Sequence, residues 1–193
     1  SDREADFFFI FDDQRRNSEN VELIVRAKHD RSTNGELGLF DTARQAPIIT
    51  QSEIKIPRQS ERSKKSKQKP KAKKSERIAQ VTIRSTEVEL NPPSYCKDKA
   101  PIKIGIVHVR ENKPPENEKA LEWFLLTTLS LNSVDDVVNC VKWYCFRWRI
   151  EDWHRVLKSG CKVEELANKT AERLKRAVAI KLVIAWRIML MTL

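Results

Sequence analysis

The sequence contains little that would build a classical zinc centre. Its four cysteines are Cys96, Cys140, Cys145 and Cys161, and no two of them form a Cys-x-x-Cys pair. The three histidines do not cluster with them. Zinc sites bring Cys and His ligands together at short, characteristic spacings, so this pattern argues against one.

An uninterrupted hydrophobic run is also missing. Residues 177–193 are rich in Ala, Val, Ile, Leu and Met, but Lys181 and Arg187 interrupt them. A bilayer-spanning helix needs about 20 predominantly apolar residues. We therefore expect a buried helix here and no membrane partner. No signal peptide is evident, so we expect reduced thiols and a cytoplasmic protein.

Charge is abundant and unevenly spread. The 193 residues carry a net charge of +10, and 33% of them are charged. Residues 57–77 alone hold ten Lys and Arg against two Glu, which leaves about +2 for the rest. This basic segment has no apolar periodicity, and we expect a loop. Two interpretations remain open, a solvated loop and an arm that contacts DNA phosphates.

Hydrophobic patterning predicts an α/β protein. The pattern Ser133-Val134-Asp135-Asp136 resembles a capping box, with Asp in place of the usual Glu, and starts a long helix that ends near Ser159 before Gly160. A further helix begins at Asn168 or Thr170 and continues to the end. Apolar runs separated by prolines predict an antiparallel β unit between two parts of a larger core. The other expected elements are a helix over 7–16 and strands over 21–26, 48–56, 79–83 with 88–90, 102–109 and 121–129.

The long helix carries the most informative residues. At about 100° per residue, one narrow face presents Tyr144, Arg147, Glu151, Arg155 and Lys158. This places a single carboxylate, a possible metal ligand, among groups that bind phosphate. The alternative is a charged surface in which Glu151 pairs with Arg147 and Arg155 four residues away. The tryptophans of this helix would then belong to the core.

The spacing Tyr-x2-Arg-x3-Glu-x6-Lys resembles the signature of the insertion-sequence-four family of DNA transposases. Tyr144, Arg147, Glu151 and Lys158 match it without a gap. Three other segments are similar to family segments in the same order, so the resemblance covers nearly the whole chain. They are Asp2-Arg3-Glu4-Ala5-Asp6, Val25-Arg26-Ala27-Lys28-His29 and Leu121-Glu122-Trp123-Phe124-Leu125-Leu126-Thr127.

The resemblance implies a partial ribonuclease-H-like core with an inserted antiparallel β subdomain. The expected parts are 1–47, the first piece of the core; 48–130, the inserted subdomain with the basic loop 57–77; and 131–193, the helical end of the core. In the family, two aspartates and one glutamate hold two Mg²⁺ or Mn²⁺ ions. Here Asp2 and Glu151 would be two of these three ligands. The chemistry implied is strand cleavage, hairpin formation and strand transfer during cut-and-paste transposition.

The same resemblance implies DNA contacts. Tyr144, Arg147 and Lys158 would hold the phosphate at the 5′ end of the transposon, and Arg155 stands where the family often has Lys. Trp123 and Trp148 would stack around a flipped base, and Arg26 would contact DNA near them. The alternative for Trp123, which stays open, is that it is a strand residue whose side chain faces the core. The partners implied are transposon ends, target DNA and, in the full-length parent, a second copy of the chain.

The family's first catalytic aspartate lies upstream of Asp2, so we expect a C-terminal catalytic fragment that does not cut DNA alone. We also expect the missing strands to leave apolar surface uncovered. One alternative is a catalytically inactive DNA-binding remnant of a transposase. Another is a structural α/β protein with a solvated charged helix. Binding through phosphates would weaken steeply with salt, whereas the structural protein would bind little DNA at any salt concentration.

Overall fold

A computed structural model describes residues 8–17, 21–56, 76–96, 98–116 and 118–191. The chain divides into two compact units, Ser1–Val141 and Lys142–Leu193. The predicted boundaries at 47/48 and 130/131 do not coincide with this division. Asp2, Phe7 and nearly all of the basic segment 57–77 lie outside the described residues.

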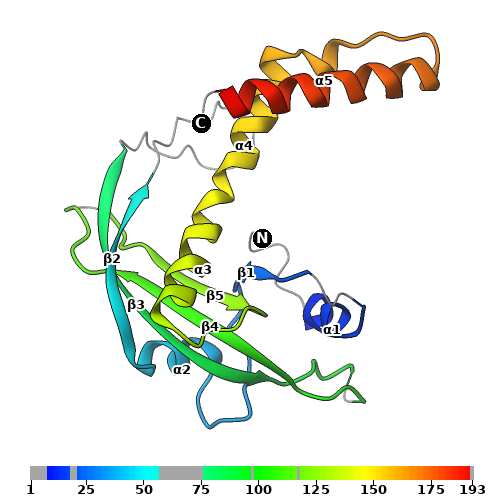
Figure 1. Cartoon of the computed structure of the whole chain (residues 1–193). Coiled ribbons are helices and arrows are strands. Elements are labelled where there is room, and N and C mark those ends of the chain that lie inside the picture. The colour runs from blue at the N-terminus through cyan, green and yellow to red at the C-terminus, as the bar shows by residue number, and fades with distance from the viewer. Residues whose placement is uncertain (1–7, 18–20, 57–75, 97, 117, 192–193) are drawn as a thin grey trace. The chain divides into compact units, whose positions relative to one another are not determined.

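The first unit is built on an antiparallel sheet (Figure 1). The sheet confirms the expected α/β class and its antiparallel β unit. The strand order β1-β5-β4-β3-β2 places the short β1 beside β5. The strands are β1 (Ile24–Arg26), β2 (Ile48–Ile56), β3 (Arg77–Leu90), β4 (Ile102–Glu111) and β5 (Glu122–Thr127).

Strand β3 buries different faces along its length. Ala79, Val81 and Ile83 are buried at one end, whereas Val88 and Leu90 are buried at the other. Successive strand residues point to opposite faces, so this change from odd to even positions moves the buried side across the sheet. The strand expected over 79–83 with 88–90 is thus a continuous strand of 14 residues with two buried faces.

Helices α1 (Phe8–Asn17) and α2 (Leu39–Gln45) share one apolar core with the sheet. Phe8 and Phe11 of the predicted first helix are buried in it, as expected. Helix α2 was not predicted. Its N-cap residue, Gly38, has no side chain to cap the helix, and Asp30 Oδ1 instead accepts a hydrogen bond from the Phe40 amide at 2.9 Å.

The capping box at the start of α3 (Val134–Phe146) is confirmed. The Asp136 amide donates to Ser133 Oγ at 3.1 Å, and the Ser133 amide donates to Asp136 Oδ2 at 2.9 Å. This reciprocal pair satisfies two amides that a helix start leaves without partners. One turn further on, Cys140 is buried and its thiol hydrogen-bonds Thr127 of β5.

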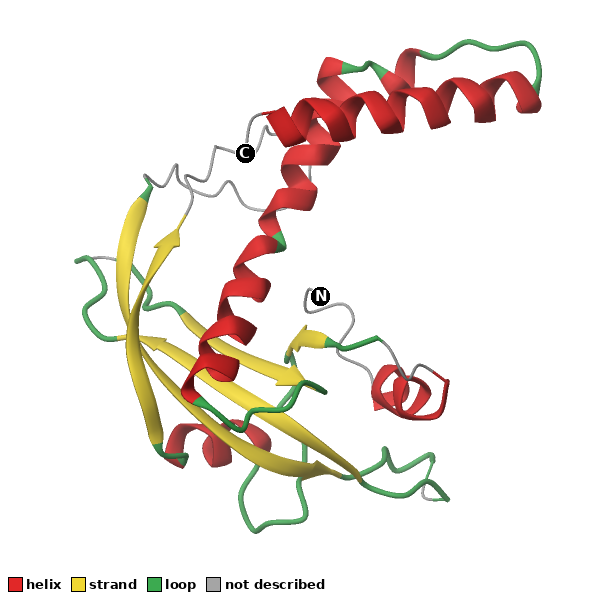
Figure 2. Cartoon of the chain, in the orientation of Figure 1, coloured by secondary structure: helices red, strands yellow, loops and turns green. Residues whose placement is uncertain are grey.

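The second unit is helical, and the predicted long helix is interrupted there (Figure 2). Arg147 separates α3 from α4 (Trp148–Arg155), and a π-helical turn, η2 (Val156–Gly160), follows directly. The Cys161 amide donates to the Val156 carbonyl at 2.8 Å, the i→i+5 bond that defines such a turn. A short 3₁₀ turn, η3 (Val163–Glu165), then leads toward α5.

Helix α5 (Ala171–Met191) begins where expected, and the Arg173 amide lies 3.4 Å from Thr170 Oγ1. The expectation that this helix is buried was wrong. Only Ala185 and Met189 are buried along it, and large apolar side chains such as Ile180, Val183 and Trp186 are exposed. None of the described helices combines the length and hydropathy that a bilayer span requires.

Candidate nucleic-acid interface

Three of the four signature residues lie together at the junction of α3 and α4. The Arg147 guanidinium carbon lies 5.9 Å from the centre of the Tyr144 ring. On its other side, Arg147 Nη1 lies 3.6 Å from Glu151 Oε1. Arg147 keeps helical dihedrals, so the residues on either side of the junction stay close to helical spacing.

These residues differ in exposure. Tyr144 is only 3% exposed, whereas the Glu151 side chain is 56% exposed. Arg147 is partly buried between them. The site therefore combines an exposed carboxylate, a partly buried guanidinium and a buried phenol ring.

Arg155 and Lys158 are exposed on the same helical segment. Arg155 pairs with Asp152, and Lys158 Nζ lies 2.9 Å from Glu164 Oε1. Of the two pairs that a purely structural charged face predicts, Glu151 forms the one with Arg147. For Arg155, the structure shows a pair with Asp152. The π-turn moves Lys158 from the position that a straight α-helix gives it, because each residue of a π-turn rotates by less than 100°.

Arg26 and Trp123 form a second group, on the sheet of the first unit. The Arg26 guanidinium carbon lies 6.0 Å from the centre of the Trp123 ring, and Arg26 Nη2 donates to the Glu122 carbonyl at 3.2 Å. Trp123 is 8% exposed, so the structure places it as a largely buried strand residue. Its ring nevertheless lies beside a cation from β1.

The metal ligands implied by the resemblance are only partly described. Glu151 is an exposed carboxylate, and Asp2 lies outside the described residues. Among the residues that the structure describes, no group of three or more His, Cys, Asp or Glu side chains could hold a metal ion. A lone glutamate does not make a two-metal site, so the described residues by themselves do not fit one.

The thiols near the site are poor nucleophiles and poor metal ligands at neutral pH. Burial raises the pKa of Cys145 to about 11. Burial also raises the pKa of Cys140 to about 12, although the hydrogen bond with Thr127 opposes it. Both groups are therefore protonated at neutral pH, whereas the thiolate is the reactive and metal-binding form.

Trp148 opens α4, and the placement of its side chain lies outside the described structure. The predicted stacking role of this residue stays a prediction. Its neighbours Trp143, Phe146 and Ile150 are exposed, so this part of the helix does not present its large apolar groups only to a core.

The division into units also changes the meaning of the net charge. Residues 142–193 hold twelve Lys and Arg against five Asp and Glu, a net of +7. Outside this unit and the basic segment 57–77, the chain holds fifteen basic against twenty acidic residues, a net of −5. The net charge of +2 outside the basic segment is therefore the sum of a strongly basic helical unit and an acidic remainder. Charge counted by unit, rather than over the whole chain, would have revealed it in the sequence.

Sequence reasoning also missed the polar cluster formed by Arg44, His108 and Glu122 in the first unit. Glu122 was named only within the expected strand 121–129 and the family-like segment 121–127, and no signal in the sequence connects it with Arg44, 78 residues away. No protein-family model matches the chain.

Proposed function

We propose that this chain is the catalytic C-terminal part of a cut-and-paste DNA transposase related to the insertion-sequence-four family, with a ribonuclease-H-like core. Its substrates would be transposon ends and target DNA. The observation that carries the proposal is the contact of Arg147 with both Tyr144 and Glu151. It brings a phosphate-binding guanidinium and a metal-binding carboxylate together at the spacing of the family signature.

The geometry of the Arg147–Glu151 pair supports a functional role. At 3.6 Å, the two charged groups are farther apart than a normal N–H···O hydrogen bond. Their contact is a loose ion pair at a partly exposed position, which contributes little to stability. An arginine beside a carboxylate can also bind a phosphate oxygen, because a guanidinium matches phosphate geometry.

The charge of the second unit supports a polyanionic partner. Its net charge of +7 includes the exposed Arg155 and Lys158 on the signature segment. Lys158 also lies within the π-turn, a feature that is frequent at functional sites. We propose that Arg155 and Lys158 contact DNA phosphates beside Arg147 and Tyr144.

The remaining roles follow from the resemblance. Arg26 and Trp123 would contact DNA next to the reacting strand, and a largely buried Trp123 would offer the edge of its ring or move outward to stack on a base. Trp148 would be the second stacking residue. Glu151 and Asp2 would contribute oxygen ligands to Mg²⁺ or Mn²⁺.

The test is a salt titration of DNA binding by fluorescence anisotropy, with a labelled duplex. The logarithm of affinity should fall linearly with the logarithm of salt concentration. Arg155→Ala and Lys158→Ala should each reduce that slope by roughly one. Lys103→Ala is the matched control, because Lys103 is an equally exposed cation paired with Glu87 in the first unit. Weak, salt-independent binding that neither variant changes would support the structural alternative.

A further inference from the structure

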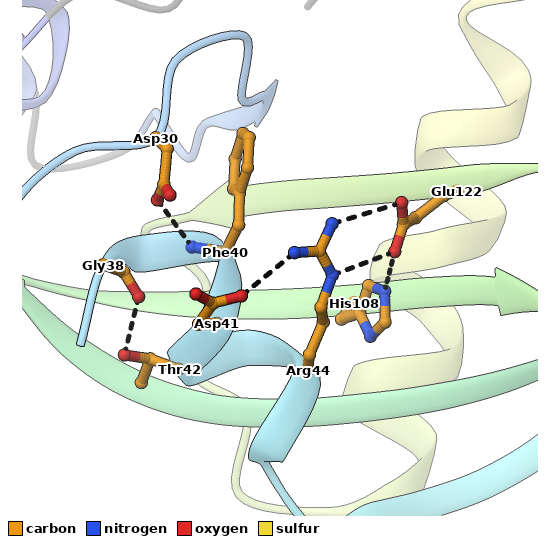
Figure 3. Close-up of polar contacts among 8 residues, drawn as sticks. All are labelled: Asp30, Gly38, Phe40, Asp41, Thr42, Arg44, His108 and Glu122. Carbon is orange, nitrogen blue, oxygen red and sulfur yellow. Dashed lines mark hydrogen bonds and ion pairs between the residues drawn. The ribbon is translucent and has the colours of Figure 1, made fainter.

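A polar cluster of the first unit surrounds the Glu122 carboxylate on β5 (Figure 3). Arg44 of α2 approaches it with Nε at 3.3 Å and Nη2 at 3.5 Å. His108 Nε2 of β4 lies 3.1 Å from the same carboxylate. Arg44 also donates to Asp41 Oδ1 at 3.0 Å, which fixes the guanidinium from its own helix. Three elements therefore meet at one side chain.

Aromatic packing makes this cluster rigid. The Phe40 and Phe124 rings stack with centroids 4.2 Å apart, and His108 stacks on the other side of Phe124 at 4.7 Å. The Arg44 guanidinium carbon lies 5.2 Å from the Phe124 ring centre. His108 is only 2% exposed, so its ring cannot move without disturbing the stack.

The opposite face of the sheet carries two of the candidate DNA-contacting residues, Arg26 of β1 and Trp123 of β5. The Glu122 carbonyl accepts the hydrogen bond from Arg26, and the next residue, Trp123, has the Arg26 guanidinium near its ring. Consecutive residues of a strand project to opposite faces. Glu122 therefore has its side chain anchored on the α2 side, while its backbone and its neighbour determine the surroundings of Arg26.

We infer that Arg44, Glu122 and His108 act as positioning residues that hold Arg26 and Trp123 in place through the β5 backbone. The inference deepens the proposed function, because it rests on DNA contact by Arg26 and Trp123. An ion pair that only stabilises the fold would not need to be linked to Arg26. Here one residue provides the link, because the Glu122 carboxylate contacts Arg44 and His108 while the Glu122 carbonyl accepts the hydrogen bond from Arg26.

Electrostatics are consistent with this role at neutral pH. Burial lowers the pKa of His108, against the opposing effects of Glu122, and Arg44 and Arg84 lower it further. Burial acts to raise the pKa of Glu122, but the hydrogen bonds of Arg44 and His108 outweigh it, and the net change is downward. A neutral His108 thus donates to an ionised Glu122. Besides Asp41, the other charged groups around the cluster are Arg84, opposite His108 on β3, and Arg110, opposite Glu122 on β4.

The first measurement requires no DNA. The full 193-residue chain is labelled with 5-fluorotryptophan, and the ¹⁹F resonance of Trp123 is assigned with Trp123→Phe. Glu122→Ala and Arg44→Ala should both move this resonance. In Glu122→Gln the resonance should stay near its position in the unmodified chain, because an amide oxygen still accepts hydrogen bonds. Glu87→Ala is the matched control, since it breaks the exposed pair with Lys103 on the same sheet.

A pH titration adds a readout that a passive ion pair would not give. The Trp123 resonance of the unmodified chain should move as His108 becomes protonated, and His108→Gln should abolish that movement. If an alanine variant does not fold, Glu122→Gln and this titration still decide the question. A Trp123 resonance that stays unchanged in the folded variants and across the titration overturns the inference.

The second measurement connects position to binding. Glu122→Ala and Arg44→Ala should weaken duplex DNA binding about threefold to tenfold, the loss of one well-placed polar contact. If the Trp123 resonance moves but affinity does not, the positioning role holds and the DNA role of Arg26 and Trp123 fails. If affinity falls while the resonance is unmoved, the proposed function survives and the positioning role is overturned.

Discussion

Lys99 Nζ lies 2.6 Å from Asp12 Oδ2, which ties the segment before β4 to helix α1. The Asp12 side chain is 5% exposed, and Arg15 and Arg16 contact its other oxygen at 3.1 and 3.2 Å. The hydrogen bond from Lys99 lowers the pKa of Asp12, burial opposes it, and Arg16 lowers it further. One carboxylate therefore pairs with three cations beside the Phe8–Phe11 core.

Asp12→Asn should destabilise the protein. The amide retains the shape of the carboxylate but removes the one negative charge that the three cations share, and breaking a buried pair costs far more than breaking an exposed one. We expect the midpoint of thermal unfolding to fall by several degrees. Glu87→Gln is the control, since its pair with Lys103 is exposed and should change the midpoint little. Equal effects of the two substitutions would contradict this prediction.

Acid should destabilise the first unit in two steps. Burial lowers the pKa of His108 below its ordinary value of 6.5, so the unfolded chain binds more protons than the folded protein just below that pH. Stability should therefore decrease as the pH falls below 6.5. The lowered pKa values of Glu122 and Asp12 add a second loss below their ordinary values of 4.5 and 3.8.

Thermal unfolding between about pH 7.5 and about pH 5.5 isolates the first step, because carboxylates titrate below that range. The unfolding midpoint of the unmodified protein should fall in this range by more than that of His108→Gln. Parallel curves for the two proteins would show that His108 does not couple to folding.

The cap of α3 allows a clean test of local stability. Ser133→Ala removes the hydroxyl that accepts from the Asp136 amide, and the free energy of unfolding should fall by about 1 kcal/mol. Ser133→Thr keeps the hydroxyl and should retain most of that stability. Urea denaturation provides the measurement, and the exposed Ser130 supplies a control in Ser130→Ala. An equal loss in Ser130→Ala would rule out a specific capping effect.

Divalent metal binding would test the carboxylates of the resemblance directly. If Glu151 and Asp2 share a metal, Glu151→Ala and Asp2→Ala should each weaken Mn²⁺ binding more than about tenfold. Removing a residue that only hydrogen-bonds a metal ligand already lowers metal affinity by about that factor. Free Mn²⁺ is measured by electron paramagnetic resonance. Glu164→Ala is the control, since Glu164 is an equally exposed carboxylate paired with Lys158. Binding that depends equally on Glu164 would contradict a specific site.

Where the determinants are local, the sequence was sufficient. The capping box at Ser133 was predicted because its four groups lie within one turn. The strands from Ile48 onward were predicted because runs of β-branched residues favour a pleated, half-buried surface. The helical face of Tyr144, Arg147 and Glu151 followed from regular periodicity, and the contacts of Arg147 with the other two confirm that they meet.

Where the determinants are distant, the sequence was not sufficient. Helix α2 depends on an aspartate eight residues before Gly38, so no local capping signal announced it. The change of buried face within β3, where the buried positions change parity between Ser85 and Val88, depends on which elements cover each side of the sheet. The exposure of α5 was missed because an apolar composition does not show which surfaces other elements cover.

By itself, the sequence determined the class of the fold and the start of each long helix. These depend on interactions between near neighbours, which short patterns encode. Only the tertiary structure decided that Arg44, His108 and Glu122 meet on one face of β5 while Arg26 and Trp123 meet on the other. That arrangement depends on strand register and on the packing of α2, and both arise from contacts between segments that are far apart in the chain.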